Sequence, residues 1–135
     1  MNEALYKRVQ ESFDTQGFLK LIGARIESVE EGCVAITLKK RDDLTQRSGV
    51  IHAGVITALA DTACGYSAYT VVPGGVDIFS AEFKINLLRP ASAQNIKAVG
   101  RVIKSGRRLI VTEADVSDSE SGKLIAKMTA TMIPV

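Results

Sequence analysis

The stretch GVIHAGVITALADTACGY, residues 49–66, opens the most apolar part of the chain and decides how the rest is arranged. From Gly54 to about Val71 the sequence is rich in Ala, Gly, Thr and Ser. A helix with so little side-chain bulk can be approached closely by a sheet on several sides. Pro73-Gly74-Gly75 is expected to end it. The sequence therefore predicts one long helix that is buried by a sheet.

The same region has to be tested as a membrane span, because Val50 to Val72 is long enough to cross a bilayer. Asp61 lies at its middle, where an ionised carboxylate costs about 3 kcal/mol to insert. His52, Gly54 and several Thr and Tyr residues make the segment less apolar still. We therefore expect a helix buried inside a soluble protein, with no membrane partner.

The N-terminal part of the chain predicts a separate helical segment, residues 1–22. Within residues 4–15 the apolar side chains Leu5, Val9 and Phe13 recur every four positions, which predicts a short amphipathic helix. It is expected to pack on the sheet edge or on another subunit, and the alternative is a frayed terminus. The stretch lacks the apolar region of a signal peptide, so we expect a cytoplasmic protein.

Alternating apolar and polar residues predict strands on both sides of the long helix. Before it, residues 24–28 and 34–38 form a hairpin around Glu31-Gly32, and its inward positions are Ala24, Ile26, Ser28, Val34, Ile36 and Leu38. After the polar loop 40–48 and the helix, turns at Ser105-Gly106 and Ser121-Gly122 separate further strands near 77–88, 96–103, 110–116 and 124–132.

The strand predicted at 77–88 has apolar residues on both faces. Strict alternation places on one face Phe79, Ala81, Phe83, Ile85 and Leu87, and on the other Ile78, Ser80, Glu82, Lys84 and Asn86. The two last strands have clearer inward sets, namely Ile110, Ala114 and Val116, then Leu124, Ala126, Met128, Ala130 and Met132.

Two strands, one long helix and four further strands make an α+β layout in which one sheet must cover one helix. The length of 135 residues, with 46% hydrophobic and 24% charged residues, suits one core. There is no repeat, low-complexity segment or linker, so a single domain over residues 1–135 is expected.

Composition argues against two classes of ligand. A net charge of +2, 5% aromatic residues and no Trp do not favour a nucleic-acid partner. Cys33 and Cys64 stand apart without a CxxC pair, which indicates buried free thiols in a reducing cytosol rather than metal ligands.

Asp61 is the residue that most needs a chemical explanation, because it is the only formally charged residue between Arg47 and Asp77. An ionised carboxylate in a helix of this kind is costly unless it is hydrogen-bonded or reaches a cleft. A catalytic role is one explanation, and a structural Asp that caps neighbouring backbone is the other.

The start of the same helix offers hydrogen-bond donors. Backbone N–H groups in the first helical turn have no partner within the helix and suit a polarised carbonyl, so Ala53 and Gly54 are candidate donors. His52 precedes them and is either a general base or a side chain that fixes the turn.

With these residues in view, GVIHAGVITALADTACGY resembles the motif at the start of the helix in hotdog thioesterases, where an HGG turn precedes an Asp or Glu nine residues after the His. The string LADTA is similar to the phenylacetyl-CoA thioesterase-like (PaaI-like) group, and FKINLLRPA, residues 83–91, resembles a strand that ends in an RP or SP pair. The resemblance extends over roughly Gly23 to Pro134. It implies a hotdog fold, in which a mainly antiparallel sheet of about six strands wraps a long central helix.

The resemblance also implies roles for four residues. Asp61 matches the acid that acts as nucleophile or as general base for water, and Gln46 matches an Asn or Gln near that water. Ala53 matches the glycine whose N–H polarises the thioester carbonyl. Ser80 matches a Ser or Thr that hydrogen-bonds near the acid.

Two positions depart from the family pattern. HAG replaces HGG, which puts a methyl group beside the thioester while keeping the backbone N–H of Ala53. Gly65 stands where some relatives have a Thr that assists the acid, so any such assistance must come from elsewhere.

The function that follows is hydrolysis of acyl-CoA thioesters, with one carboxylate for the attack and one helix N-terminus for the developing oxyanion. No metal or organic cofactor is needed, and coenzyme A enters as part of the substrate. Lys104, Arg107 and Arg108 surround one turn and either meet the CoA phosphates or are ordinary solvated charges.

The resemblance implies a site between two subunits, with Gln46 and Ala53 of one facing Asp61 and Ser80 of the other. It predicts a homodimer at least and favours a homotetramer. Two other functions stay open: a hotdog β-hydroxyacyl hydratase or dehydratase with His52 as general base, and a non-catalytic acyl-CoA-binding protein.

Overall fold

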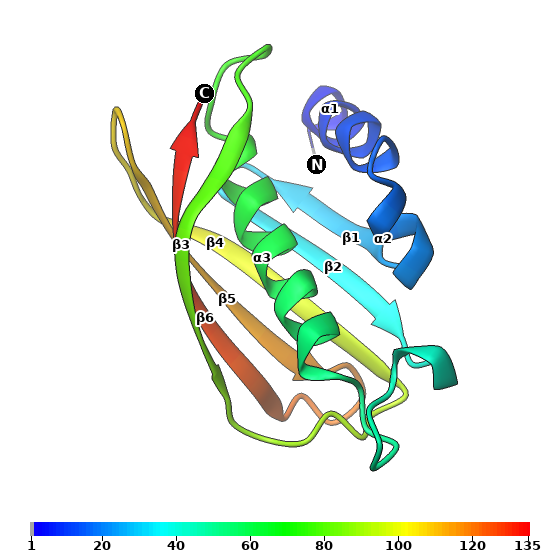
Figure 1. Ribbon diagram of the computed structural model, residues 1–135. Helices are drawn as coiled ribbons and strands as arrows, with labels where there is room; N and C mark the ends of the chain where they lie inside the picture. The colour runs from blue at the N-terminus through cyan, green and yellow to red at the C-terminus, as the bar shows by residue number, and fades with distance from the viewer. Residues whose placement is uncertain (1) are drawn as a thin grey trace.

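The computed structural model describes residues 2–135, which form one six-stranded sheet, one long helix and two short N-terminal helices (Figure 1). In chain order the elements are α1 (Glu3–Asp14), α2 (Gly17–Ile22), β1 (Arg25–Glu30), β2 (Cys33–Lys39), η1 (Asp42–Leu44), α3 (Ala53–Tyr69), β3 (Ile78–Leu87), β4 (Asn95–Ser105), β5 (Ile110–Asp118) and β6 (Leu124–Pro134). No helix of residues 2–135 combines the length and the apolar character that a bilayer crossing requires.

The sheet has the strand order β1-β2-β4-β5-β6-β3, and every neighbouring pair is antiparallel. It curves around α3, which lies along its concave face, while α1 and α2 pack beside β1 (Figure 1). This arrangement confirms the predicted α+β hotdog fold. It leaves β1 and β3 at the two edges of the sheet, with β3 next to α3.

Helix α3 begins at Ala53 and ends at Tyr69, close to the predicted bounds. One face packs on the sheet through fully buried side chains that include Leu59, Ala60, Ala63 and Cys64. The opposite face is only half-buried in the chain. The sheet therefore covers α3 from one side, and the small residues on the other side remain accessible.

Small side chains let α3 approach β4 very closely at Gly100. A Cβ atom built on Gly100 would lie 2.2 Å from the carbonyl oxygen of Ala63, well inside van der Waals contact. Because the obstructing atom belongs to helix backbone, no side-chain rotation relieves the clash. Gly100 is thus required by the packing of helix on sheet.

We expect Gly100→Ala to lower the free energy of unfolding by about 3 kcal/mol, because extra bulk in a packed core forces backbone shifts. Chemical denaturation followed by circular dichroism measures this loss. Gly17→Ala is the matched control, since a Cβ at Gly17 meets nothing within 4 Å and its φ is not positive. A Gly100→Ala protein as stable as the control would contradict the packing argument.

The prediction of strand faces is wrong in two places, and β-bulges explain both. In β3 the register shifts between Ser80 and Glu82, so Phe79 lies on the opposite face from Phe83 and is 60% exposed. In β1 a shift between Ile26 and Ser28 turns Val29 inward in place of Ser28. An extra residue reverses the alternation of the strand beyond it.

The N-terminal segment is helical and firmly packed, which excludes a frayed terminus. Val9 and Phe13 of α1 are buried, as their spacing predicts. Arg8 donates hydrogen bonds of 2.8 and 2.9 Å to the carbonyl oxygens of Tyr69 and Val72, and its guanidinium lies 4.3 Å from the centre of the Tyr69 ring. These bonds satisfy carbonyls at the C-terminal end of α3 and fix α1 beside it.

Candidate active site

Asp61 lies midway along α3 on its accessible face. The side chain is half-buried and accepts a 2.7 Å hydrogen bond from the Ser80 hydroxyl of β3. None of the ion pairs within residues 2–135 includes Asp61. A carboxylate can accept about four hydrogen bonds, so this one keeps acceptor capacity for a ligand. Asp61 is therefore oriented by one bond and otherwise available.

The bulge in β3 explains how Ser80 reaches Asp61. Ser80 pairs with Met132, whose side chain is fully buried on the helix-facing side of the sheet, and the Ser80 hydroxyl also lies 3.4 Å from the Met132 sulfur. After the bulge, Phe83 and Ile85 pair with the buried Ala130 and Met128. Both halves of β3 thus turn residues toward α3, Ser80 in the first half and apolar residues in the second.

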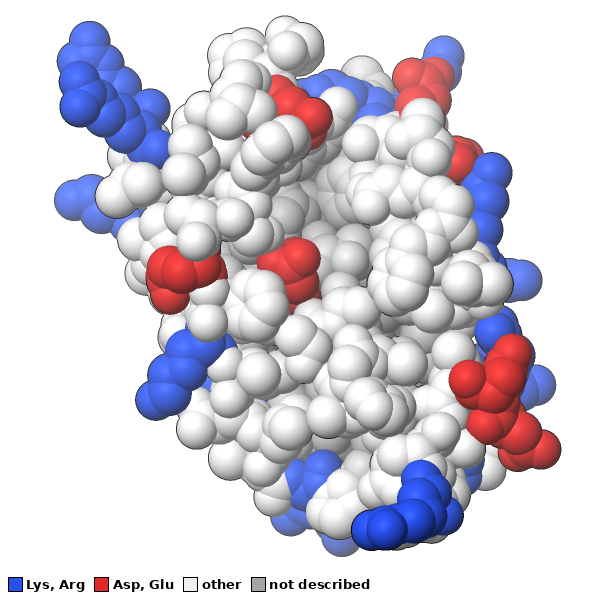
Figure 2. Space-filling model, viewed as in Figure 1, with Lys and Arg blue, Asp and Glu red and all other residues white. Residues whose placement is uncertain are grey.

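A cavity opens beside Asp61 and extends toward the C-terminal end of α3. Its lining comes from α1, α3, β3 and the adjoining loops, and consists of Ser12, Gln16, Asp61, Thr62, Gly65, Tyr66, Tyr69, Asp77, Ile78 and Ser80. In Figure 2, Lys and Arg lie around the rim of this face, whereas its hollowed centre shows uncharged and acidic residues. The cavity is a polar one with a carboxylate on its wall.

A second cavity lies at the other end of α3. Its lining combines the loop before the helix with the end of β3, and consists of Gln46, Arg47, Ser48, Val50, Ile51, His52, Ala53, Ile56, Leu87, Leu88, Arg89, Pro90 and Ala91. The Gln46 side chain accepts a hydrogen bond from the Ser48 N–H, and the backbone of Gln46 bonds Val50 and Gly49. These bonds shape the turn that leads into the helix and hold Gln46 near Ala53.

His52 caps the helix. Its Nδ1 accepts a 2.8 Å hydrogen bond from the Gly54 N–H, which satisfies one of the unpaired donors of the first turn. The Ala53 N–H has no acceptor within residues 2–135. Of the two predicted donors, Gly54 is therefore already occupied and Ala53 is free.

The two cavities hold different parts of the predicted site. Asp61 and Ser80 line the first, and Gln46, His52 and Ala53 line the second. Asp61 follows Ala53 by eight residues, or about 12 Å along the helix axis at 1.5 Å per residue. One carbonyl group cannot contact both groups at that separation, so the predicted site residues of a single chain fall into two separate sets, called half-sites below.

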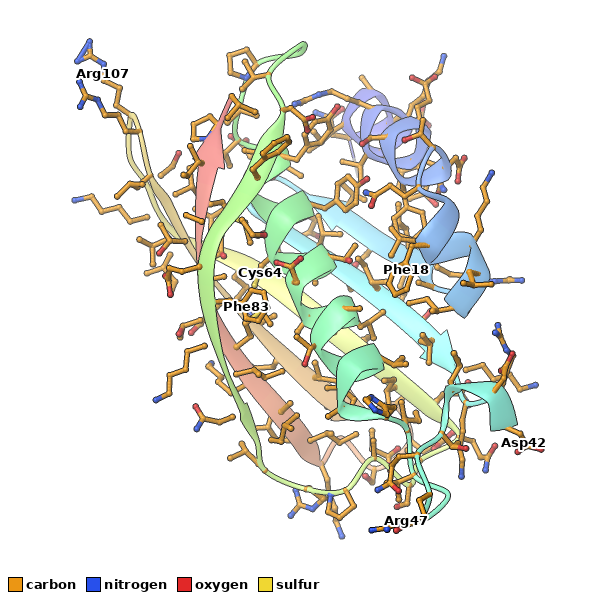
Figure 3. All side chains as sticks on the ribbon, viewed as in Figure 1. Phe18, Asp42, Arg47, Cys64, Phe83 and Arg107 are labelled. Atoms are coloured by element: carbon orange, nitrogen blue, oxygen red, sulfur yellow. The ribbon has the colours of Figure 1, made fainter. Side chains whose placement is uncertain are left out.

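The predicted cations of the β4–β5 hairpin lie outside both half-sites. Lys104, Arg107 and Arg108 are exposed, and none lines either cavity. Figure 3 shows Arg107 at the tip of the hairpin, at the opposite end of the molecule from Arg47 beside the second cavity. Within one chain these three side chains are surface charges.

Neither of the two cysteines lines either cavity. Both are free thiols. Cys33 is half-buried, which corrects its prediction as a buried thiol, and Cys64 is fully buried on the face of α3 that packs on the sheet. Burial raises the pKa of the Cys64 thiol to about 12, which keeps it protonated at neutral pH. Within residues 2–135 no cluster of three His, Cys, Asp or Glu side chains is placed to hold a metal ion.

Sequence reasoning missed three residues that line the Asp61 cavity, namely Ser12, Gln16 and Asp77. Ser12 lies in α1 and Gln16 between α1 and α2, and their polar character is the only signal they give. That signal does not indicate which other element they approach.

Comparison with known proteins gives consistent matches. The family model described as thioesterase superfamily matches residues 48–125, a range that contains His52, Ala53, Asp61 and Ser80. The crystal structure of a thioesterase family protein from Silicibacter pomeroyi is similar at 33% identity and a TM-score of 0.93, covering 97% of this chain and 98% of that one.

Curated relatives extend the comparison. A Saccharolobus solfataricus protein provisionally named an esterase is 30% identical over 125 residues, which is 93% of this chain and 84% of that protein. Human acyl-coenzyme A thioesterase 13 is 24% identical over 129 residues, covering 94% of this chain and 91% of the human protein. The similarity therefore extends over nearly the whole chain.

Proposed function

This chain belongs to the thioesterase superfamily, and on that premise we propose that it hydrolyses acyl-CoA thioesters to a free carboxylic acid and CoA. The sequence similarity to the human protein named acyl-coenzyme A thioesterase 13 supports CoA as the thiol component. The observation that carries the proposal is Asp61, a carboxylate oriented by Ser80 on the wall of a cavity and free of ion pairs.

Asp61 would act in one of two ways. As a nucleophile, a carboxylate oxygen bonds to the thioester carbon, the C–S bond breaks to release the CoA thiolate, and water then hydrolyses the resulting anhydride. As a general base, the carboxylate takes a proton from water while the water oxygen bonds to the same carbon. The C–S bond then breaks, and the CoA thiolate leaves and takes up the proton that Asp61 holds. Both paths need the acceptor capacity that the single bond from Ser80 leaves open.

The oxyanion that forms in either path needs a donor, and we assign the Ala53 N–H to it. Because Ala53 and Asp61 are too far apart on one helix, the donor must come from a second copy of the chain. In the resulting homodimer, Gln46 and Ala53 of one protomer face Asp61 and Ser80 of its partner. Two-fold symmetry then creates two identical composite sites.

Strand β3 supports a second copy as the partner. It is an edge strand whose outer side has no neighbour within the described chain, and such edges invite pairing. It also exposes Phe79 at 60%, Phe83 at 44% and Leu87 at 52% of their surfaces. Figure 3 shows Phe83 beside the accessible face of α3. A homotetramer and a cytoplasmic location stay predictions.

Neither path requires a cofactor, and CoA takes part as the leaving group. The Lys104, Arg107 and Arg108 hairpin stays a proposed phosphate site. Since it lies outside both half-sites of its own chain, it would have to reach CoA bound at a site completed by another protomer.

The hydratase alternative requires His52 to act as a base, and its observed bond disfavours that role. A neutral imidazole whose Nδ1 accepts from Gly54 carries its proton on Nε2, so no free lone pair faces outward. We expect His52→Ala to keep acyl-CoA hydrolysis within about tenfold of the wild type while losing about 1 kcal/mol of stability with the cap. Steady-state kinetics and denaturation curves measure the two effects. A loss as large as that of an Asp61 variant would favour the hydratase mechanism.

A steady-state assay on a panel of acyl-CoAs, with detection of the released thiol, tests the proposed function. Turnover of at least one chain type is the expected result. Binding of acyl-CoA without turnover of any member would instead identify a non-catalytic binding protein.

A further inference from the structure

The hairpin between β4 and β5 concentrates positive charge without any acidic residue. Its residues 103–111, IKSGRRLIV, contain Lys104, Arg107 and Arg108 and neither Asp nor Glu. These three positive charges exceed the net charge of +2 of the whole chain. None of them belongs to an ion pair within residues 2–135. The protein itself therefore leaves the charge of the hairpin uncompensated.

The middle of the same sheet carries cations that are compensated. Lys97, Arg101 and Lys127 alternate in their strands with residues that face α3, so they lie on the convex face of the sheet. Each forms an ion pair of 3.0 to 3.4 Å with a carboxylate on another strand. The contrast shows that the unpaired charge is a property of the hairpin and not of the whole face.

The hairpin also exposes apolar side chains beside its cations. Ile103 is 56% exposed, Leu109 is 52% exposed and Val111 is 39% exposed. Val111 lies between two buried residues of β5 and pairs with Lys104, so both of these side chains point to the convex face. Neighbouring apolar side chains left in water at one end of a sheet indicate a surface that binds something.

The shape of the hairpin favours a flat partner. The hairpin projects from the sheet (Figure 1), and Arg107 at its tip points away from the rest of the molecule (Figure 3). Its cations line neither cavity, so the hairpin offers no groove to a peptide. A bilayer surface needs no groove, because apolar side chains enter the boundary of the acyl chains while Lys and Arg stay among anionic headgroups.

The combination of charge and apolar surface disfavours two other partners. The hairpin of a second copy would bring like charges together. The phosphates of CoA would pair with the cations but leave Ile103 and Leu109 in water. Only an anionic lipid surface matches both the charge and the apolar side chains.

We propose that the β4–β5 hairpin docks the protein on the surface of a bilayer that contains anionic lipids. Lys104, Arg107 and Arg108 contact the phosphate headgroups, and the apolar side chains enter the interface. This contact with the bilayer surface is separate from a membrane span, which no helix of residues 2–135 can form. Strand β6 lies between the hairpin and the edge strand β3, so docking depends neither on the proposed dimer nor on thioester hydrolysis.

Co-sedimentation of the full chain with vesicles tests the proposal. One set of vesicles is phosphatidylcholine alone, and in the other about one lipid in three is phosphatidylglycerol. We expect the partition constant to be about tenfold or more higher on the anionic vesicles. Raising the salt concentration to about 0.5 M should remove most of this difference, because salt screens the headgroup charge.

Variants of the hairpin separate docking from general charge effects. Arg107→Gln combined with Arg108→Gln should lower the partition constant on anionic vesicles by about 25-fold, since each cation contributes about fivefold. Leu109→Ser should lower it by about fivefold through the lost apolar contact. The matched control combines Lys20→Gln with Lys39→Gln, which removes the same charge from two exposed positions outside the hairpin. It should stay within about threefold of the wild type. Circular dichroism checks that each variant is folded.

Three results would overturn the lipid surface as the partner. The first is equal partition of the wild type on both kinds of vesicle, or an equal loss in the lysine control. The second is release from anionic vesicles by free CoA but not by a salt of the same ionic strength, which would assign the cations to CoA. The third is a smaller oligomer of Leu109→Ser in analytical ultracentrifugation, which would assign the hairpin to an interface between copies. Acyl-CoA hydrolysis without vesicles tests the proposed function alone, and its absence would leave the docking surface standing.

Discussion

Replacing Asp61 with Asn should reduce kcat/KM for acyl-CoA hydrolysis by a factor of about 10² or more, the usual loss when a catalytic acid–base or nucleophilic group is removed. Asn keeps the size of the side chain and can still accept the Ser80 hydrogen bond, so the local structure should persist. It cannot attack a thioester carbon or take a proton from water. Steady-state kinetics with thiol detection measure the loss.

Asp42→Asn is the matched control for this change. Asp42 is an exposed carboxylate in η1 that lines neither cavity, and Figure 3 shows it at the periphery of the molecule. The same chemical substitution there should leave kcat/KM unchanged. An Asp61→Asn enzyme with at least half of the wild-type kcat/KM would contradict the assigned role of the carboxylate.

The sequence predicts the helix and the sheet well because hydrophobic periodicity reflects burial directly. Val34, Ile36 and Leu38 are almost completely buried, as alternation indicates, and α3 lies within two residues of its predicted bounds. The bulges in β1 and β3 were not predictable, since a single extra residue shifts the register without changing the composition of the strand.

The candidate site is predictable in part from the residues themselves and in part from resemblance to known motifs. Asp61 stands out as the only charged residue between Arg47 and Asp77, whereas Ser80 came from a motif, and the two meet in the structure at 2.7 Å. Alternation alone placed Ser80 with Glu82 and Lys84, and only the bulge separates it from them. Ser12 and Gln16 belong to no motif, because what places them beside Tyr66 is the packing of α1 and α2 on α3.

Position 53 allows a substitution that removes one hydrogen-bond donor and little else. Ala53 is the first residue of α3, where proline is well accommodated, and His52 has the extended backbone (φ −59°, ψ 138°) that a following proline favours. Since the Ala53 N–H has no partner in the chain, Ala53→Pro should leave the stability of the fold within about 1 kcal/mol of the wild type. The variant therefore tests the loss of the proposed oxyanion donor with little other change to the protein.

We expect Ala53→Pro to reduce kcat by a factor of about 10² to 10³, the range found when one oxyanion donor is lost. The loss should appear in kcat more than in KM, because the donor acts on charge that develops in the transition state. Ala53→Gly keeps the N–H and is the control, with activity expected near that of the wild type. Equal activity of the Pro and Gly variants would exclude the Ala53 N–H as the donor.

Combining the two defective chains tests the composite site itself. A heterodimer of an Asp61→Asn chain with an Ala53→Pro chain has two different composite sites. One site takes its carboxylate from the Ala53→Pro chain and its N–H from the Asp61→Asn chain, so it is intact. The other site has both defects. Heterodimers purified through two different tags should show about half of the wild-type activity, although each homodimer is nearly inactive. A site contained within one chain would leave both sites of the heterodimer defective and give no recovery. Activity that returns on pairing therefore requires that the first turn of α3 in one protomer and Asp61, midway along α3 in the other, act on the same thioester.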